Sequence, residues 1–398
     1  MKSNLTNTKQ MNALVELQSC GQSVWLDNIS KAILDSGELT RLIDEDGLRG
    51  VTSNPTIFEK AINGSRDYDE ALSQLARAGR SVDEIYEALV IDDIRRATDL
   101  FRPLFRLSDG LDGYVSLEVS PKLANETERT LEEARRLWKK VDRANVMIKV
   151  PATPAGIPAI EQLISEGINV NVTLMFSMEH YVRVAEAYVR GLQKRAQKGQ
   201  SLAVGSVASF FVSRVDSLID KQIEDRLARV SSANERQELE SLLGKTAIAN
   251  SRLVYQKFKE IFGRRAFLDL KEKGARVQRP LWASTSTKNP KYRDVLYAEE
   301  LIGADTVDTM PPATIEAFRD HGQVRASIDQ GLEEAEGVFR SLARLGIDMN
   351  AATEKLQADG VKLFADSFDT LMKSLASKRE SLAKLDRPSS PNRNSLTG

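Results

Sequence analysis

The chain has 398 residues, and 56 Lys and Arg against 57 Asp and Glu give a formal net charge of −1. This balance argues against a nucleic-acid partner, which a basic excess would indicate, and gives no reason to expect an anionic membrane surface as partner. Hydrophobic residues make up 41% and charged residues 28%, as is typical of a globular protein. The length fits two or three ordinary domains or one large α/β barrel.

Cysteine and histidine are scarce, which limits the possible metal sites. The chain has one cysteine, Cys20, and two histidines, His180 and His321. An intramolecular disulfide, a multi-cysteine zinc site and a three-histidine metal site are therefore excluded. We interpret His180, which follows Glu179 in a helical pattern, as a surface or interface residue.

The amino-terminal residues are polar and contain no apolar core of a signal peptide. The chain also has no apolar run of about 18 residues, which a transmembrane helix would need. We therefore expect a cytoplasmic protein with no membrane partner.

Short apolar segments alternate with helical patterns along most of the chain. Connections of this strand–helix–strand kind join parallel strands, and eight such strands predict a closed (β/α)8 barrel, or TIM barrel. The predicted strands span residues 24–29, 50–53, 113–119, 145–150, 169–176, 202–212, 280–286 and 305–310. Helical patterns between them include residues 126–142, 156–166, 178–195 and 290–302.

Two regions lie outside this alternation of strands and helices, one within the predicted barrel and one at its C-terminal end. Residues 214–262 are too long for one crossover helix and predict two or more. Phe364, Phe368, Leu371 and Leu375 recur at helical spacing, which predicts an amphipathic helix on the barrel exterior. We expect a lead-in over residues 1–20, a catalytic barrel over 21–322, C-terminal helices packed on the barrel over 323–380 and a disordered tail over 381–398.

Polar residues alternate with apolar ones in two predicted strands. Ser116 and Glu118 share one face of the third strand, and Asn171 and Thr173 share one face of the fifth. Helices between the strands argue that the outer face is covered, so the polar face is expected to look into the barrel. Buried polar groups are costly unless they are paired, which indicates a functional site.

Lys149 interrupts the apolar fourth strand, and lysine is rarely buried without a partner. Burial disfavours the charged ammonium, and a neutral amine attacks carbonyl groups to form a Schiff base. The alternative is a side chain whose stem packs while its charged end extends into solvent.

Two carboxylates are predicted at the same face as Lys149, because the carboxyl ends of parallel barrel strands converge there. Asp27 ends the first strand and Glu118 the third. Acid–base catalysis and a salt bridge to the lysine both remain open for each of them.

Other polar residues also follow the strand ends. Asn54, Asn171, Thr173 and Ser209 suit a polyol substrate, although residues of these types also cap backbone groups at strand ends. Arg214 and the run of hydroxyl residues that ends in Lys288 are typical of the phosphate site of a barrel, and a helix cap is the alternative for that run. The run contains Ser284 and Ser286. A dinucleotide-binding glycine motif does not follow any predicted strand.

Five segments in this order resemble the transaldolase family, over about residues 21–375. They are residues 50–56 (GVTSNPT), 146–153 (VMIKVPAT), 167–174 (GINVNVTL), 209–214 (SFFVSR) and 282–290 (WASTSTKNP). The forms of the first and last segments are similar to the longer bacterial branch, as in cyanobacteria and actinobacteria. The resemblance implies a circularly permuted class I aldolase barrel and a monomer or homodimer.

The resemblance also implies a role for each site residue. Lys149 would form the Schiff base, Asp27 would be the general base and acid, and Glu118 and Thr173 would hold the water used in imine chemistry. Asn54, Asn171 and Ser209 would bind substrate hydroxyls, and Arg214 and Ser284 the phosphate. Where other members have a second arginine this chain has Ser286 and Lys288, so either one could complete the phosphate site.

The activity implied is that of a pentose phosphate pathway transferase that acts on sugar phosphates without a metal or organic cofactor. It would move a dihydroxyacetone unit from sedoheptulose 7-phosphate to glyceraldehyde 3-phosphate, giving erythrose 4-phosphate and fructose 6-phosphate. The alternatives are a fructose-6-phosphate-type aldolase of the same superfamily and a non-catalytic barrel that binds sugar phosphates.

Overall fold

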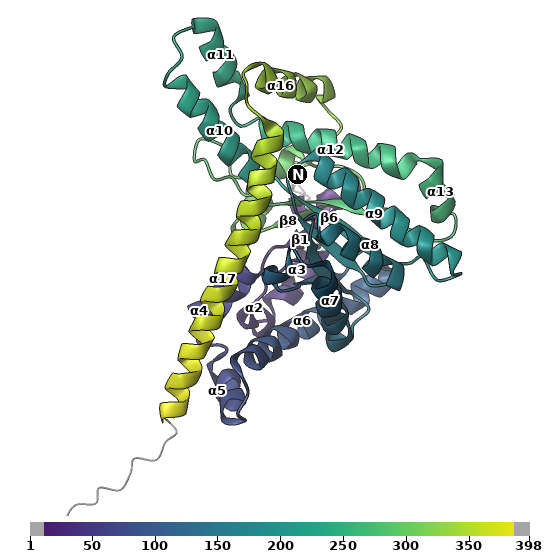
Figure 1. Ribbon diagram of the computed structural model, residues 1–398, viewed down its shortest axis with the longest axis vertical. Helices are drawn as coiled ribbons and strands as arrows, with labels where there is room; N and C mark the ends of the chain where they lie inside the picture. Colours follow the sequence, from purple (N-terminus) through teal and green to yellow (C-terminus); the bar gives the residue numbers. More distant parts are fainter. Residues whose placement is uncertain (1–11, 386–398) are drawn as a thin grey trace, which may run out of the picture.

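A computed structural model describes residues 12–385, in which eight parallel strands close into a barrel in chain order (Figure 1). All eight predicted strands are confirmed, most of them shorter than predicted. They are β1 (Gln22–Leu26), β2 (Gly50–Val51), β3 (Tyr114–Glu118), β4 (Val146–Pro151), β5 (Val170–Met175), β6 (Ser206–Phe211), β7 (Arg279–Ala283) and β8 (Thr306–Met310). The (β/α)8 fold class is confirmed.

Helices surround the barrel and connect its strands (Figure 1). Two short helices precede the barrel, α1 (Ala13–Glu16) and η1 (Leu17–Cys20). The barrel helices are α2 (Lys31–Asp35), α3 (Glu38–Glu45), α4 (Pro55–Gly64), α5 (Asp69–Arg77), α6 (Val82–Leu107), η2 (Pro121–Leu123), α7 (Thr127–Val141), α8 (Gly156–Glu166), α9 (Met178–Gln197), α10 (Ser213–Leu227), α11 (Ala233–Leu242), α12 (Thr246–Gly263), α13 (Arg265–Lys271), α14 (Leu296–Glu300) and α15 (Pro312–His321). Two more follow, α16 (Leu332–Arg344) and α17 (Met349–Leu385).

Most of the helix predictions are confirmed, and the exception lies after β7. The prediction over 290–302 is wrong for its first part, because only α14 is an α-helix there. Asn289 instead closes a turn, with its side-chain oxygen accepting from the Lys291 N–H and its carbonyl from the Tyr292 N–H. Asn side chains compete in this way with helical hydrogen bonds.

The barrel interior is layered from its amino-terminal end upward. At the bottom, the Arg279 guanidinium donates to Asp112 at 2.9 Å and to Ser23 at 2.8 Å. Above them Trp25 packs directly on Gly50, where an added Cβ would lie 2.5 Å from the indole ring. The closed, filled lower barrel leaves only the carboxyl ends of the strands open to a ligand.

Helix α17 packs against α4, α5 and α6 on the outside of the barrel (Figure 1), and it also crosses the carboxyl ends of β4 and β5. The Gln357 side chain donates to the carbonyls of Ala152 and Leu174 at 3.1 and 2.9 Å. Gly360 permits the close approach, since a Cβ there would lie 2.9 Å from a methyl group of Leu174. The strand-end carbonyls and this small residue therefore bind the helix across the rim.

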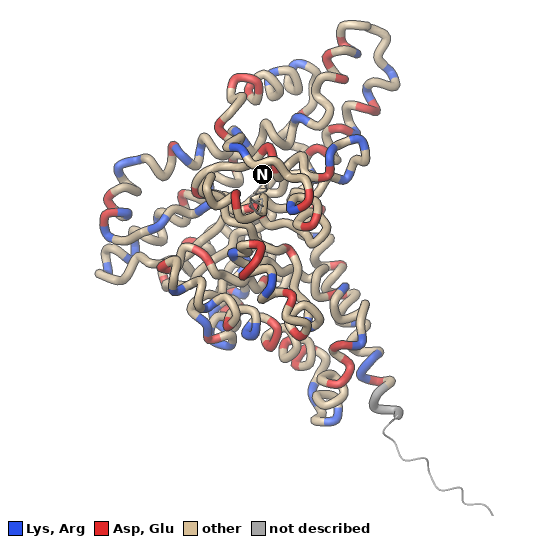
Figure 2. The backbone as a smooth tube through the Cα atoms, turned by 180° about the vertical axis from the view of Figure 1, so that it is seen from behind, with Lys and Arg blue, Asp and Glu red and all other residues tan. Residues whose placement is uncertain are grey.

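Helix α17 continues through Leu385, into the segment predicted to be a tail, and residues 386–398 lie outside the described residues. In the described part of the chain, each helix is too short or too polar to cross a membrane. Lys and Arg are interspersed with Asp and Glu along the helices (Figure 2), consistent with the balanced net charge.

Candidate active site

A cavity of about 550 Å³, here called the mouth cavity, opens at the carboxyl ends of the strands. Its volume lies in the range of small-molecule sites. Nine of the eleven predicted site residues line it: Asp27, Asn54, Lys149, Thr173, Ser209, Arg214, Ser284, Ser286 and Lys288. The other two, Glu118 and Asn171, lie beside and below it.

Lys149 lies at the base of the mouth cavity and is 4% exposed. Strand β4 pairs in register with β3 and β5, which places Lys149 between Glu118 and Asn171. The Nζ atom donates to the Ser53 carbonyl at 3.1 Å and lies 3.4 Å from Glu118 Oε2. The amine is therefore held inside the barrel and does not extend into solvent.

Asp27 follows β1 and faces the mouth cavity from the opposite side of the barrel. Its Oδ1 accepts a hydrogen bond from Thr52 Oγ1 at 2.7 Å, and Thr52 Oγ1 is also 2.7 Å from Thr309 Oγ1. Burial raises the pKa of Asp27, while Lys149, the Thr52 hydrogen bond, Arg214 and Lys288 act in the opposite direction. Burial and the surrounding cations therefore act on this carboxyl in opposite directions, as is common for groups at functional sites.

Glu118 is the last residue of β3 and is directly beside Lys149. Burial raises its pKa to about 7, against the opposing effect of Lys149. Its Oε2 and the Thr173 Oγ1 are both buried and without a hydrogen-bond partner among the described residues. Buried polar atoms normally have such partners, so these two atoms are suited to hold a small polar molecule such as water.

The amide and hydroxyl residues differ in how freely they face a ligand. Asn171 is fully buried, donates to Ser116 Oγ at 2.9 Å and accepts from Ser209 Oγ at 2.6 Å. It therefore lies one layer below the mouth cavity and positions Ser209. The Asn54 side chain caps α4 by accepting from the Ile57 N–H at 3.0 Å, as the capping alternative predicted.

Basic side chains gather on one side of the mouth cavity. Arg214, in the first turn of α10, lies 5.2 Å from the centre of the Phe211 ring. Burial and the neighbouring Arg214 and Lys60 lower the pKa of Lys288, which also donates to Ser286 Oγ at 2.7 Å. Because Lys288, Arg214 and Lys60 repel one another, this side of the mouth cavity favours a bound anion.

The loop after β7 carries a further mark of an anion site. Ser284 has a positive φ of 59°, an uncommon conformation for a residue with a side chain. Its hydroxyl lies 3.0 Å from that of Ser213, and its carbonyl accepts from the Ser213 N–H at 3.0 Å. This strained turn therefore fixes the loop against the amino terminus of α10, the end of a helix that favours anions.

Sequence reasoning missed other residues that line the mouth cavity, among them Thr52, Lys60 and Phe364. Phe364 on α17 places its ring centre 5.7 Å from Lys149 Nζ. Thr52 stands two residues before Asn54 in the segment already selected, and Lys60 lies on the first two turns of the helix that Asn54 caps. Those positions offered a signal for both residues, whereas the position of Phe364 depends on long-range packing.

The interpretation of His180 as a surface residue is wrong, because it is 3% exposed. Its Nδ1 accepts from the Phe176 N–H at 3.3 Å, and its Nε2 lies 2.8 Å from Glu354 Oε1 on α17. The ring therefore connects the end of β5 to α17. Among residues 12–385 there is no group of three His, Cys, Asp or Glu side chains arranged to hold a metal ion.

Comparison with known proteins places this site in a family. Residues 24–375 match the model of the transaldolase/fructose-6-phosphate aldolase family. A Nostoc protein named Transaldolase 2 is 48% identical over 92% of this chain and 98% of its own length. Proteins named transaldolase from Thiobacillus denitrificans and Mycobacterium marinum are 49% and 45% identical, over 91% and 93% of this chain and 99% and 98% of their own lengths. The chain belongs to the transaldolase/fructose-6-phosphate aldolase family.

Proposed function

We propose that the mouth cavity catalyses the transaldolase reaction of the pentose phosphate pathway, in the cytoplasm. A dihydroxyacetone unit moves from sedoheptulose 7-phosphate to glyceraldehyde 3-phosphate, giving erythrose 4-phosphate and fructose 6-phosphate. The observation that carries the proposal is the buried Lys149 amine at the base of a cavity with a carboxyl on either side and cations at its rim.

The first step joins Lys149 to the ketose. Its amine attacks the C2 carbonyl, and the resulting carbinolamine loses water to become a protonated imine. Glu118 is 3.4 Å from the amine and has a pKa of about 7, which suits it to move protons in both directions near neutral pH. Glu118 and Thr173 hold the water between the two half-reactions: Glu118 Oε2 has only its ion pair with Lys149, and Thr173 Oγ1 is buried without a hydrogen-bond partner among the described residues.

The second step breaks the C3–C4 bond. Asp27 takes the proton of the C4 hydroxyl, the bond breaks, and its electron pair moves into the imine to give an enamine on Lys149. The Thr52 hydrogen bond lowers the pKa of Asp27 against the effect of burial, which favours the ionised form that can act as a base. The imine nitrogen is the electron sink in this step.

The rim of the mouth cavity binds the phosphate. Arg214 and Lys288 supply positive charge, and Lys60 joins them from α4. Both Ser286 and Lys288 line the cavity and are bonded to each other, so we assign them jointly to the phosphate site with Ser284. Ser209 and Asn54 lie on the path between this rim and Lys149 and bind sugar hydroxyls, with Asn171 as support.

Transfer, as opposed to simple aldol cleavage, requires that water does not protonate the enamine before the acceptor arrives. The Phe364 ring covers the Lys149 amine, and α17 is bonded across the rim through Gln357. This apolar cover supports a transferase over the fructose-6-phosphate-type aldolase. The two activities are separated by measuring released dihydroxyacetone with and without an acceptor aldehyde phosphate.

The test of the mechanism is reduction of the imine with borohydride in the presence of fructose 6-phosphate, followed by peptide mass mapping. The expected result is a three-carbon or six-carbon adduct on Lys149, which is lost in Lys149→Ala. A non-catalytic sugar-phosphate barrel would give no adduct. An adduct on another lysine would contradict the assignment of Lys149.

A further inference from the structure

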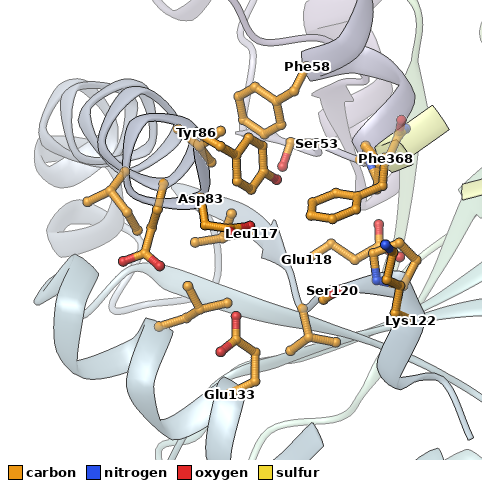
Figure 3. Close-up of a pocket in the computed structure, with 18 of the residues that line it drawn as sticks. Ser53, Phe58, Asp83, Tyr86, Leu117, Glu118, Ser120, Lys122, Glu133 and Phe368 are labelled. Atoms are coloured by element: carbon orange, nitrogen blue, oxygen red, sulfur yellow. The ribbon is translucent and has the colours of Figure 1, made fainter. Parts of the chain in front are cut away.

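A second cavity, here called the side cavity, lies beside Glu118, is lined by residues of α6, α7 and α17 and has a volume of about 310 Å³ (Figure 3). Aromatic side chains form much of its wall, with Phe58 and Tyr86 on one side and Phe368 on the other. The side chain of Glu118 lies between Phe368 and Ser120 (Figure 3). The side cavity thus reaches the carboxyl that contacts Lys149.

The two cavities divide the ionisable groups of the site between them. Asp27, Lys149 and Thr173 line the mouth cavity, whereas Glu118 lines the side cavity. Glu118 Oε2 is 3.4 Å from Lys149 Nζ, so this carboxyl stands at the boundary between them. The two carboxyls consequently approach the amine from different compartments.

The side cavity combines polar groups with room for water. Its volume of about 310 Å³ is well above what a single water needs. Glu118, Ser120 and Tyr86 supply polar atoms along it. Burial and the nearby Glu118 raise the pKa of Tyr86, so its hydroxyl remains protonated at neutral pH and can donate a hydrogen bond.

The far end of the side cavity reaches the protein surface. Lys122 and Arg136 line it there, and their side chains are 54% and 47% exposed. Arg136 pairs with Glu87 at 2.7 Å and with Glu133 at 2.8 Å. These ion pairs surround the opening with charged groups that are compatible with entering water.

We propose that the side cavity is the water reservoir of the imine steps: it takes up the water that passes Glu118 when Lys149 condenses with the ketose and returns water to Glu118 for hydrolysis, while the sugar fills the mouth cavity. This inference rests on the proposed function. In the forward step the Lys149 ammonium and the C2 carbonyl become a protonated imine and one water. The N–C bond forms, the C2–O bond breaks, and two protons from nitrogen leave with the oxygen, so atoms and charge balance.

Oxygen exchange tests the proposal in an Asp27→Asn background, because we expect this variant to form the imine while the intact sugar stays in the mouth cavity. The enzyme is incubated with fructose 6-phosphate in 18O-labelled water. Label entering the C2 carbonyl is measured by mass spectrometry, and imine formation is measured by borohydride trapping. Lys149→Ala supplies the background of spontaneous exchange. The quantity compared is label incorporated per imine formed.

Cavity-filling and cavity-enlarging substitutions at one position provide the matched pair. Val90 on α6 lines the side cavity and is 2% exposed. Val90→Phe is expected to lower the label incorporated per imine several-fold, because the expelled water is trapped and returns to the same carbon. Val90→Ala removes packing at the same position but leaves the route open. Its label incorporated per imine is therefore expected to equal that of the Asp27→Asn variant. A general packing defect would affect both.

A second filling variant, Phe368→Trp on the opposite wall, keeps the test decisive if Val90→Phe does not fold. Thermal unfolding identifies the folded variants. An unchanged exchange ratio in the folded filling variants, together with a borohydride adduct on Lys149, would overturn the side-cavity route alone. Absence of that adduct in both the wild-type enzyme and the Asp27→Asn variant would overturn the proposed function and this inference with it.

Discussion

The hydrogen bond from Thr52 to Asp27 gives the most direct test of the role of general base that we propose for Asp27. Thr52 is 2% exposed, and its Oγ1 donates to Asp27 Oδ1 at 2.7 Å. Thr52→Val keeps nearly the same side-chain shape and removes this donor. Because the hydrogen bond lowers the pKa of Asp27 and burial raises it, the substitution leaves the effect of burial less opposed. The pKa of Asp27 is expected to rise.

The size of the effect follows from the charge on the acceptor. A hydrogen bond to an ionised group is worth about 1.5–3 kcal/mol, because the charge strengthens it and burial limits the competition from water. At pH values below the pKa of Asp27, activity is expected to be proportional to the ionised fraction of this carboxyl. There, kcat/KM is expected to fall about 10- to 100-fold, since about 1.4 kcal/mol corresponds to a factor of ten. Above that pKa, the loss should be much smaller.

The assay is the pH dependence of kcat/KM for transfer from fructose 6-phosphate to erythrose 4-phosphate, with borohydride trapping as a measure of imine formation. Thr309→Val is the matched control. It removes the hydrogen bond between Thr309 Oγ1 and Thr52 Oγ1, which are 2.7 Å apart, but keeps the Thr52 hydroxyl that donates to Asp27. Its acid limb is expected to stay near that of the wild type. An acid limb that does not move in Thr52→Val, or that moves equally in Thr309→Val, would refute the reasoning.

Three other substitutions examine the cover, the barrel floor and a buried carboxyl. Phe364→Ala is expected to increase the dihydroxyacetone released per transfer event, measured by coupled product assays, because water gains access to the enamine. Arg279→Met leaves Asp112 buried without its ion-pair partner, which should lower the free energy of unfolding in urea by about 3–5 kcal/mol, with Lys149 trapping retained. Burial raises the pKa of Asp308 to about 7, so the folded state retains a proton that the unfolded chain releases from about pH 4 upward. The free energy of unfolding should therefore fall between these pH values, and Asp308→Asn should remove this slope and be more stable than the wild type at pH 8 in the same urea assay.

Local sequence patterns predicted the barrel and its inner face well, because both depend on alternation within a strand. Ser116 and Glu118 on β3 and Asn171 on β5 all meet around Lys149, as their shared parity indicates. A polar residue in a strand that is covered by helices on the outside can only be satisfied within the barrel. The alternation of polar and apolar residues along a strand therefore predicts most of the side chains that point into the barrel.

Contacts between distant segments were not accessible in the same way. The hydroxyls of Thr56 on α4 and Ser367 on α17 are 2.8 Å apart, and His180 meets Glu354 on the same C-terminal helix. The apolar spacing of α17 predicted that the helix would have a buried face, but not which surface would cover it. For this reason the spacing predicted the helix but not its passage over the carboxyl ends of the strands, and the contact between Phe364 and Lys149 was missed.

The strand order of the barrel accounts for the different tasks that we propose for Asp27 and Glu118. Strands β3 and β4 are neighbours, and Glu118 pairs directly with Lys149, so Glu118 reaches the amine from the side. Strands β1 and β4 are not neighbours in the barrel, so Asp27 approaches Lys149 only across the mouth cavity. A sugar bound to Lys149 extends into that same space, so its C4 hydroxyl is within the region that Asp27 faces and Glu118 does not. On the proposed mechanism we therefore expect that Glu118 does not replace Asp27 in bond cleavage, and that Asp27→Ala accumulates the imine with the uncleaved ketose even though a second carboxyl lies within 3.4 Å of the nitrogen.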